Sequence, residues 1–209
     1  MIIDASALAN IYVGLNTAFN AAFQASEVWH PLVAMTVPAS TKIMDYKFML
    51  DFPTVREWIG DRVVRSLEGM SYQITTKDWE ATIEVDRNDI RDDQIGLYAP
   101  VVSALGEEAR AHPDRLIADL LLNGWTEPCF DGRPFFAADH PVGEGTASND
   151  AGGEDTPWFL LDTRRAIKPF IYQLRQPVQL TRMDRAEDEH VFMRRHYRFG
   201  VDARYTCAY

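Results

Sequence analysis

The sequence predicts an α+β fold, in which helices and an antiparallel sheet come from separate parts of the chain. Residues 85–124 start at the end of a strand, pass through a charged turn and then indicate a long amphipathic helix, because apolar residues recur at helical spacing from Tyr98 onward. Residues 72–86 alternate between apolar and polar side chains, which is typical of strands with one buried face. Residues 158–209 contain further strand patterns that are separated by a charged turn.

Residues 1–50 predict an N-terminal helix followed by an extended arm. Between residues 4 and 26, apolar side chains recur at helical intervals, at Leu8, Ile11, Tyr12, Leu15, Phe19 and Phe23. From residue 29 the pattern becomes strand-like and is broken by Pro31 and Pro38. The apolar stripe of the helix is narrow, so the helix needs a partner surface, either its own core or a neighbouring subunit.

Residues 51–84 predict an extended, hairpin-like ribbon. A strand pattern at residues 62–67 is followed by the turn signal Glu68-Gly69, and alternation resumes at Tyr72. A two-stranded ribbon is barely stable by itself. We therefore expect residues 60–78 to make little contact with the core of their own chain and to dock on another surface.

Residues 85–143 predict the long helix and the loop that follows it. Pro100 fits the first turn of the helix, and Asn123-Gly124 supply a stop signal. Pro113 removes one helical hydrogen bond, so a kink or a restart is expected there. Because Val101 belongs to the apolar pattern, Val101→Asp is expected to abolish the soluble subunit.

Residues 144–157 consist largely of small and polar residues without apolar periodicity, the composition of an exposed bridge. Residues 158–209 predict a mainly antiparallel sheet. A short buried strand is expected at residues 158–162, and another strand begins at Lys168. Further strands are expected at residues 175–183 and 189–207, on either side of the charged turn.

The composition excludes several classes of protein. A formal net charge of -10 over 209 residues argues against non-specific wrapping of nucleic acid, and a solvated face is the better interpretation of Arg194, Arg195 and Arg198. The two cysteines, Cys129 and Cys207, form neither a zinc motif nor a disulfide framework, which suggests a reducing cytoplasm. Neither a membrane-spanning run nor a secretory signal is recognisable in the sequence.

The most enzyme-like group of residues is Cys129, Asp131, Asp139 and His140, which lie in one loop. A cysteine nucleophile with a histidine base is a known arrangement, but its members normally meet through the fold rather than within one loop. Nothing in the sequence indicates a lowered pKa for the thiol. A structural loop is the favoured interpretation, and no catalytic, cofactor-binding or metal-binding residues are predicted.

Two other groups of residues resemble metal sites only superficially. His190 and His196, with Asp188 and Glu189 nearby, would lie roughly 20 Å apart along one strand, too far to bind one ion. A second group contains four acids, but it lacks the glycine and the terminal glutamate of a calcium loop: Asp86, Asp89, Asp92 and Asp93. Acids that complement helix termini are the better explanation of that second group.

Several long segments resemble the Mu-like phage major head subunit family, in order between Phe52 and Asp202: residues 52–64, 72–124, 129–143 and 158–177. The resemblance implies the HK97-like fold of tailed-phage major capsid proteins. Residues 1–50 would then be the N-terminal arm and 51–84 the extended loop that lies across a neighbouring subunit. Residues 85–143 would contain the spine helix, and 158–209 would form the peripheral-domain sheet.

The sequence departs from this family at residues 144–157, where longer family members insert an axial domain, so that domain is expected to be missing or truncated. The resemblance implies a structural, non-enzymatic subunit that forms the hexamers and pentamers of an icosahedral shell around DNA. Scaffold, protease and portal proteins are candidate partners, and the expected location is the virion, after assembly in the bacterial host cytoplasm. The alternatives are a cysteine-dependent hydrolase using Cys129 and His140, and a non-virion shell protein of the same fold.

Overall fold

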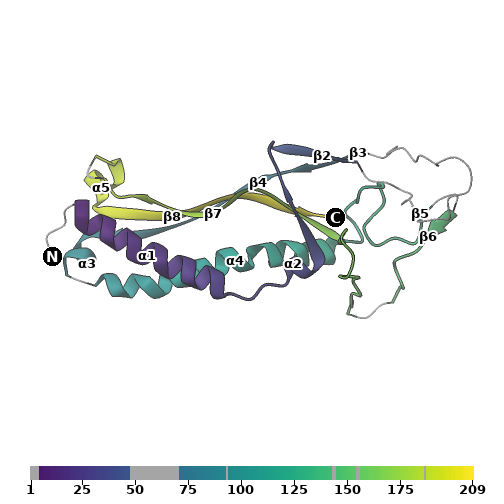
Figure 1. Cartoon of the computed structure of the whole chain (residues 1–209), viewed down its shortest axis with the longest axis horizontal. Helices are drawn as coiled ribbons and strands as arrows, with labels where there is room; N and C mark the ends of the chain where they lie inside the picture. The colour runs from purple at the N-terminus through teal and green to yellow at the C-terminus, as the bar shows by residue number, and fades with distance from the viewer. Residues whose placement is uncertain (1–4, 48–70, 93, 143–144, 154–155, 186) are drawn as a thin grey trace, which may run out of the picture.

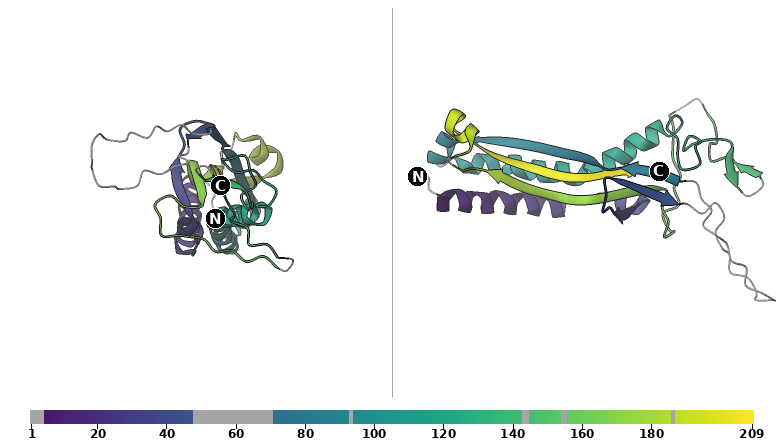
Figure 2. Two further views of the ribbon diagram at one scale, coloured as in Figure 1. Left: turned by 90° about the vertical axis from the view of Figure 1, so that its right-hand side faces the viewer. Right: turned by 90° about the horizontal axis from the view of Figure 1, so that it is seen from above.

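The computed structural model describes residues 5–47, 71–92, 94–142, 145–153, 156–185 and 187–209. The molecule is elongated, and the helices α1 (Ala5–Ala25) and α4 (Tyr98–Asn123) lie side by side along its long axis (Figure 1). A four-stranded sheet covers them, with its strands running lengthwise (Figure 2). No described helix is both long and apolar enough to cross a membrane.

The strand order of the large sheet is β1-β7-β8-β4. Its members are β1 (Ala34–Pro38), β7 (Phe170–Met183), β8 (His196–Ala208) and β4 (Lys77–Asp86). The pairs β7–β8 and β4–β8 are antiparallel, whereas β1 runs parallel to β7. The predicted alternation in β4 is confirmed, because Ala81, Ile83 and Val85 are at least half-buried. Thr82 and Glu84, which lie between them, are exposed.

The helix–sheet core fills the space between α1, α4 and the sheet. Its buried members include Leu15, Phe19, Val85, Val102 and Phe199. α1 and α4 approach closely at Gly106, where an added Cβ would lie 2.6 Å from the carbonyl oxygen of Phe19. The N-terminal helix therefore finds its partner surface within its own chain.

A second cluster lies at the C-terminal end of α4, where Ile117, Leu121, Phe170 and Tyr209 are buried. Beside it, the Asp114 carboxylate accepts hydrogen bonds from the backbone N–H groups of Trp29 and His30, at 3.1 and 2.9 Å. The His30 ring also lies 2.6 Å from Asp114, through Nδ1. These contacts hold the start of the short helix α2 (His30–Val33) against α4.

The limits predicted for the long helix are confirmed, with Pro100 in its first turn and Gly124 as its C-cap. Of the kink or restart predicted at Pro113, the restart is wrong, because α4 continues through that residue, and the kink stays a prediction. The place of Val101 in the apolar pattern is also wrong. Val101 is 49% exposed, whereas its neighbour Val102 is fully buried and carries the apolar face of the helix.

The predicted ribbon of residues 51–84 is only partly described, because 48–70, including the strand expected at 62–67, lie outside the described residues. Residues 71–75 form β3 (Ser71–Thr75), which pairs with β2 (Ile43–Lys47). Ile74 is buried against Ile171 and Ala208, and β4 belongs to the large sheet. The expectation of little contact with the core is therefore wrong for residues 71–78.

The late sheet also differs from the prediction in two places. Residues 158–162 form no strand, because no described strand pairs with them. Phe159 and Leu161 pack against the second cluster, whereas Trp158 and Leu160 are exposed. Residues 189–194 are helical, α5 (Glu189–Arg194), and the left-handed Arg195 ends this helix before β8 begins. The two strands expected from Lys168 to 183 are the single strand β7, which contains register shifts.

Short elements complete the fold: α3 (Arg87–Arg91), the 3-10 turn η1 (Ile95–Leu97), and the hairpin of β5 (His140–Val142) with β6 (Gly145–Ala147). Asp86 caps α3 by accepting the N–H of Asn88 at 2.6 Å, and Asp89 lies in the first turn. These two acids thus stabilise the N-terminus of α3, as predicted.

Candidate functional site

The post-helix loop, residues 125–142, contains the residues that the sequence analysis singled out. A tight turn starts at Cys129. The backbone carbonyl of Cys129 accepts a hydrogen bond from the N–H of Gly132 at 3.1 Å, and the backbone N–H of Cys129 donates one to the carbonyl of Arg133 at 2.7 Å. Gly132 has a φ of 79°, a left-handed conformation that a residue without a Cβ adopts readily. This turn directs the side chains of Cys129 and Asp131 toward each other.

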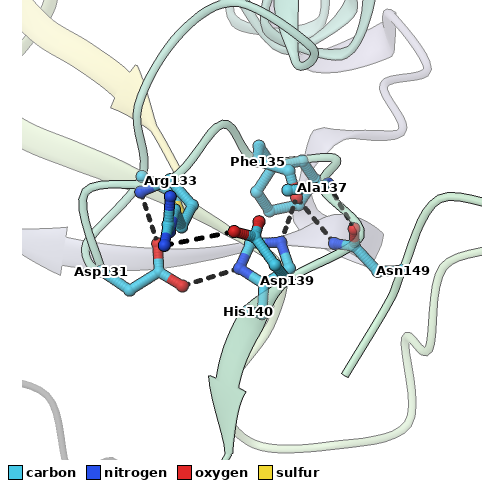
Figure 3. Close-up of polar contacts among 8 residues, drawn as sticks. Asp131, Arg133, Phe135, Ala137, Asp139, His140 and Asn149 are labelled. Carbon is cyan, nitrogen blue, oxygen red and sulfur yellow. Dashed lines mark hydrogen bonds and ion pairs between the residues drawn. The ribbon is translucent and has the colours of Figure 1, made fainter. Parts of the chain in front are cut away.

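Three side chains of the loop, those of Cys129, Asp131 and His140, converge on one point. Figure 3 shows Asp131 and His140 directed toward each other. The Cys129 thiol donates to Asp131 Oδ1 at 3.0 Å, and His140 Nδ1 lies 2.6 Å from Asp131 Oδ2. The other ring nitrogen of His140, Nε2, lies 3.1 Å from the carbonyl oxygen of Phe135. Asp139 points elsewhere and forms a half-exposed ion pair with Arg133 at 3.1 Å. Three of the four singled-out residues therefore meet.

Asn149, which the sequence analysis did not single out, fastens the bridge to this loop (Figure 3). Its side chain accepts the N–H of Ala137 at 2.9 Å and donates to the carbonyl of Phe135 at 2.6 Å. At the base of the loop, the ring of Phe136 covers Gly124, leaving no room for a Cβ there. No local sequence signal would have identified Asn149, because asparagine is common in exposed loops.

The electrostatics of the loop do not produce a reactive thiol. Burial, together with the hydrogen bond to Asp131, raises the pKa of Cys129 to about 11. Burial acts to raise the pKa of Asp131 as well, but its hydrogen-bonded contacts with Cys129, His140 and the Arg133 N–H lower that pKa below its ordinary value. Asp131 stands between the thiol and the imidazole, so His140 is not hydrogen-bonded to Cys129 as a general base would be.

The other residues considered for metal binding remain separate. His190 lies on α5 and faces the carbonyl of Met183 at 3.2 Å, whereas His196 begins β8. Among the described residues, Cys129, Asp131 and His140 form the group whose ligand atoms could reach a common ion.

Exposed apolar side chains are the second functional feature of the surface. At one end of the molecule, Phe192 and Met193 on α5 are 80% and 70% exposed. At the other end, Trp158 and Leu160 in the chain after the bridge are 77% and 87% exposed (Figure 1). Adjacent exposed apolar side chains of this kind make these two ends candidates for contact with other molecules.

Solved structures with this architecture define the class of protein, the subunits of tailed-phage heads. A chain in the procapsid of bacteriophage JBD30 matches with a TM-score of 0.87 and 37% sequence identity, over 99% of this chain and 73% of that one. A chain in the capsid of the same phage matches with a TM-score of 0.68 and 30% identity, over 86% and 60% of the two chains. The HK97-like capsid fold that the sequence resemblance implied is thus confirmed.

Curated relatives agree with this class. The major capsid protein of Escherichia phage Mu is 39% identical over 188 residues, and the Mu-like prophage FluMu major head subunit of Haemophilus influenzae is 34% identical over 211. The family model of the Mu-like prophage major head subunit gpT matches residues 8–209. The chain belongs to this family. It spans 62% of the length of the Mu protein and 68% of the FluMu protein.

Proposed function

We propose that this chain is a structural subunit of a phage or prophage head, which assembles with copies of itself into an icosahedral shell that encloses DNA. The observation that carries the proposal is the match of 99% of the chain to a procapsid subunit, together with membership of the head subunit family. In this proposal the chain acts without catalysis, and its location is the virion, after assembly in the cytoplasm of a bacterial host.

The surface of the chain supports association with other copies. A compact monomer of this mass exposes about 9,900 Å². The chain exposes 13873 Å². Among the described residues, the four most exposed large apolar side chains lie at opposite ends, on α5 and after the bridge. Two such ends can contact two different neighbours, as repeated contacts around the hexamers and pentamers of a shell require.

The parts of the fold have corresponding roles in this proposal. α4 is the spine helix, the sheet of β7 and β8 belongs to the peripheral domain, and residues 51–84 include the loop that crosses a neighbour. The bridge at residues 144–157 replaces the axial domain of longer family members. Scaffold, protease and portal proteins are the partners that assembly of such a head would involve.

Electron microscopy and light scattering of the purified chain test the proposal. We expect species much larger than the monomer, increasing with protein concentration. The double variant Phe192→Asp/Met193→Asp should assemble less while keeping the circular dichroism spectrum of the parent, because its changes lie on the surface. Ala151→Asp, an exposed change in the bridge, adds a negative charge away from α5 and serves as the control.

A chain that stays monomeric at raised concentration would overturn the proposal. Shells that form equally well from the α5 double variant would exclude α5 as a contact surface. A non-virion shell of the same fold would assemble in the same way, so genes for a portal, a terminase and a scaffold protease beside this gene are needed to identify a phage head.

A further inference from the structure

We propose that Cys129, Asp131 and His140 form a binding site for a divalent transition-metal cation, with Zn²⁺ as the best match. Their ligand atoms, a thiol sulfur, a carboxylate oxygen and Nδ1, all lie within 4.8 Å of one another. Zinc–ligand bonds of about 2.0–2.3 Å place tetrahedral ligands about 3.3–3.8 Å apart. Side-chain shifts of about 1 Å therefore suffice to bind the ion.

The orientation of the His140 ring points to a cation. The carbonyl of Phe135 can only accept a hydrogen bond, so Nε2, at 3.1 Å, carries the proton that is donated to it. In the neutral ring, Nδ1 then directs its lone pair at a carboxylate oxygen of Asp131 only 2.6 Å away. At this distance only a proton fits between the two atoms, and a metal ion that takes the place of that proton would move them about 0.7 Å farther apart. Metal-binding histidines usually donate their other N–H in this manner.

The loop also fixes the positions of the ligands. The Arg133 N–H donates to Asp131 Oδ1 at 2.9 Å, and Asn149 donates to the same Phe135 carbonyl that holds His140. The Asp131 side chain is 2% exposed and that of His140 is 16% exposed. A buried carboxylate of this kind needs a positive partner. The outer hydrogen bonds supply the support that metal ligands require.

The ligand set selects the type of ion and its charge. Sulfur and imidazole ligands favour zinc and similar metals over magnesium and calcium, which prefer oxygen. When the ion binds, Cys129 releases its thiol proton to solvent, and any proton on His140 Nδ1 is released as well. No oxidation state changes in this step. A thiolate, a carboxylate and a neutral imidazole balance the charge of a divalent cation, and water completes the four-coordinate site.

Such an ion would connect the turn after α4 to the start of β5, immediately before the bridge at residues 144–157. The expected consequence is a more stable post-helix loop. Because each site is built within one chain, the proposal is independent of shell assembly, and it is tested on dissociated chains.

Cobalt is the appropriate probe, because Co²⁺ bound to a thiolate absorbs strongly in the near ultraviolet and weakly in the visible range. The full chain, stripped with a chelator, should bind one Co²⁺ with this thiolate absorption, and Zn²⁺ should displace it. Cys129→Ser should lose the absorption, and His140→Ala should weaken Co²⁺ binding by at least about tenfold. Cys207→Ser, a change at the other cysteine of the chain, should bind as the parent does.

Thermal melting supplies a second measurement, which covers the case in which Cys129→Ser folds poorly. Added Zn²⁺ should raise the melting temperature of the parent chain and of Cys207→Ser, but not that of His140→Ala. Failure of the parent chain to produce the thiolate absorption would overturn the proposal. The proposal would also be overturned if the thiolate absorption persisted in Cys129→Ser or were lost in Cys207→Ser.

Discussion

The helix–sheet core and the post-helix loop are joined to the same helix but are held together by different forces. In the core, apolar side chains such as Phe19, Val102 and Phe199 are almost fully buried, so stability comes from area removed from water. In the loop, Phe135 and Phe136 pack against the second cluster. Around them few side chains are fully buried, and polar contacts of Asp131, His140 and Asn149 define the shape of the loop. A change in the core should therefore unfold the chain, whereas a change in the loop should act locally.

The strongest test of this contrast is Val102→Asp. Val102 is fully buried between α4, α1 and the sheet, and a carboxylate there would lose its hydration without gaining a partner. We expect a loss of about 4 kcal/mol or more in the free energy of unfolding, observed as insoluble protein or the absence of a cooperative thermal transition.

Val101→Asp is the matched control for that change. The neighbouring side chain is half-exposed, so a carboxylate there stays hydrated and the monomer should melt almost as the parent does. If both aspartate variants were equally damaging, the orientation assigned to α4 would be wrong.

A smaller global effect is expected from Gly106→Ala. The new Cβ would meet the Phe19 carbonyl at 2.6 Å, so α1 and α4 would have to separate, at a cost of about 1–3 kcal/mol. Gly14→Ala in α1 is the control, because nothing lies within 4 Å of its Cβ position. Removing a helical glycine there should stabilise the chain by about 0.5–1 kcal/mol. Chemical denaturation measures the free energy of unfolding of both variants. A Gly106→Ala variant more stable than the parent would contradict the close approach of α1 and α4.

The pH dependence of stability tests the buried pair of His30 and Asp114, which lies beside the second cluster. Burial lowers the pKa of His30, although its contacts with Asp114 act to raise it, and burial likewise lowers the pKa of His112. The unfolded chain therefore binds more protons than the folded chain as the pH falls below about 6.5, so stability should fall with pH in this range.

His30→Asn isolates one of these two histidines. The asparagine amide can still donate to Asp114 but does not titrate, so the variant should lose less melting temperature than the parent between about pH 7.5 and pH 5.5. Parallel losses in the two proteins would remove His30 as a source of the pH dependence.

The smallest effect is expected in the loop. Asn149→Ala removes the contacts to Ala137 and Phe135, each worth about 1 kcal/mol at most because the site is partly exposed. Hydrogen exchange of the Ala137 amide should accelerate, while the global melting temperature should hardly change. A large fall in that temperature would show that the loop and the core unfold as one unit.

Local patterns predicted the elements whose own side chains decide their conformation. The alternation of β4 and the limits of α4 were correct because burial follows residue period within one element. The prediction of a strand at residues 158–162 was wrong because a strand also needs a neighbouring strand, and none of the described strands pairs with this segment. The prediction of a strand at residues 189–194 was also wrong, because these residues form α5, which the left-handed Arg195 separates from β8.

The sequence by itself determined the α+β class, the long helix and, through its resemblance to head subunits, the family. Only the tertiary structure decided that Val102 rather than Val101 faces the core, that β1 runs parallel to β7, and that Asp114 caps α2. It also decided that Cys129, Asp131 and His140 converge. Periodicity records which face of an element is apolar, whereas contacts between distant residues depend on chain direction and turn geometry, which no single local pattern contains.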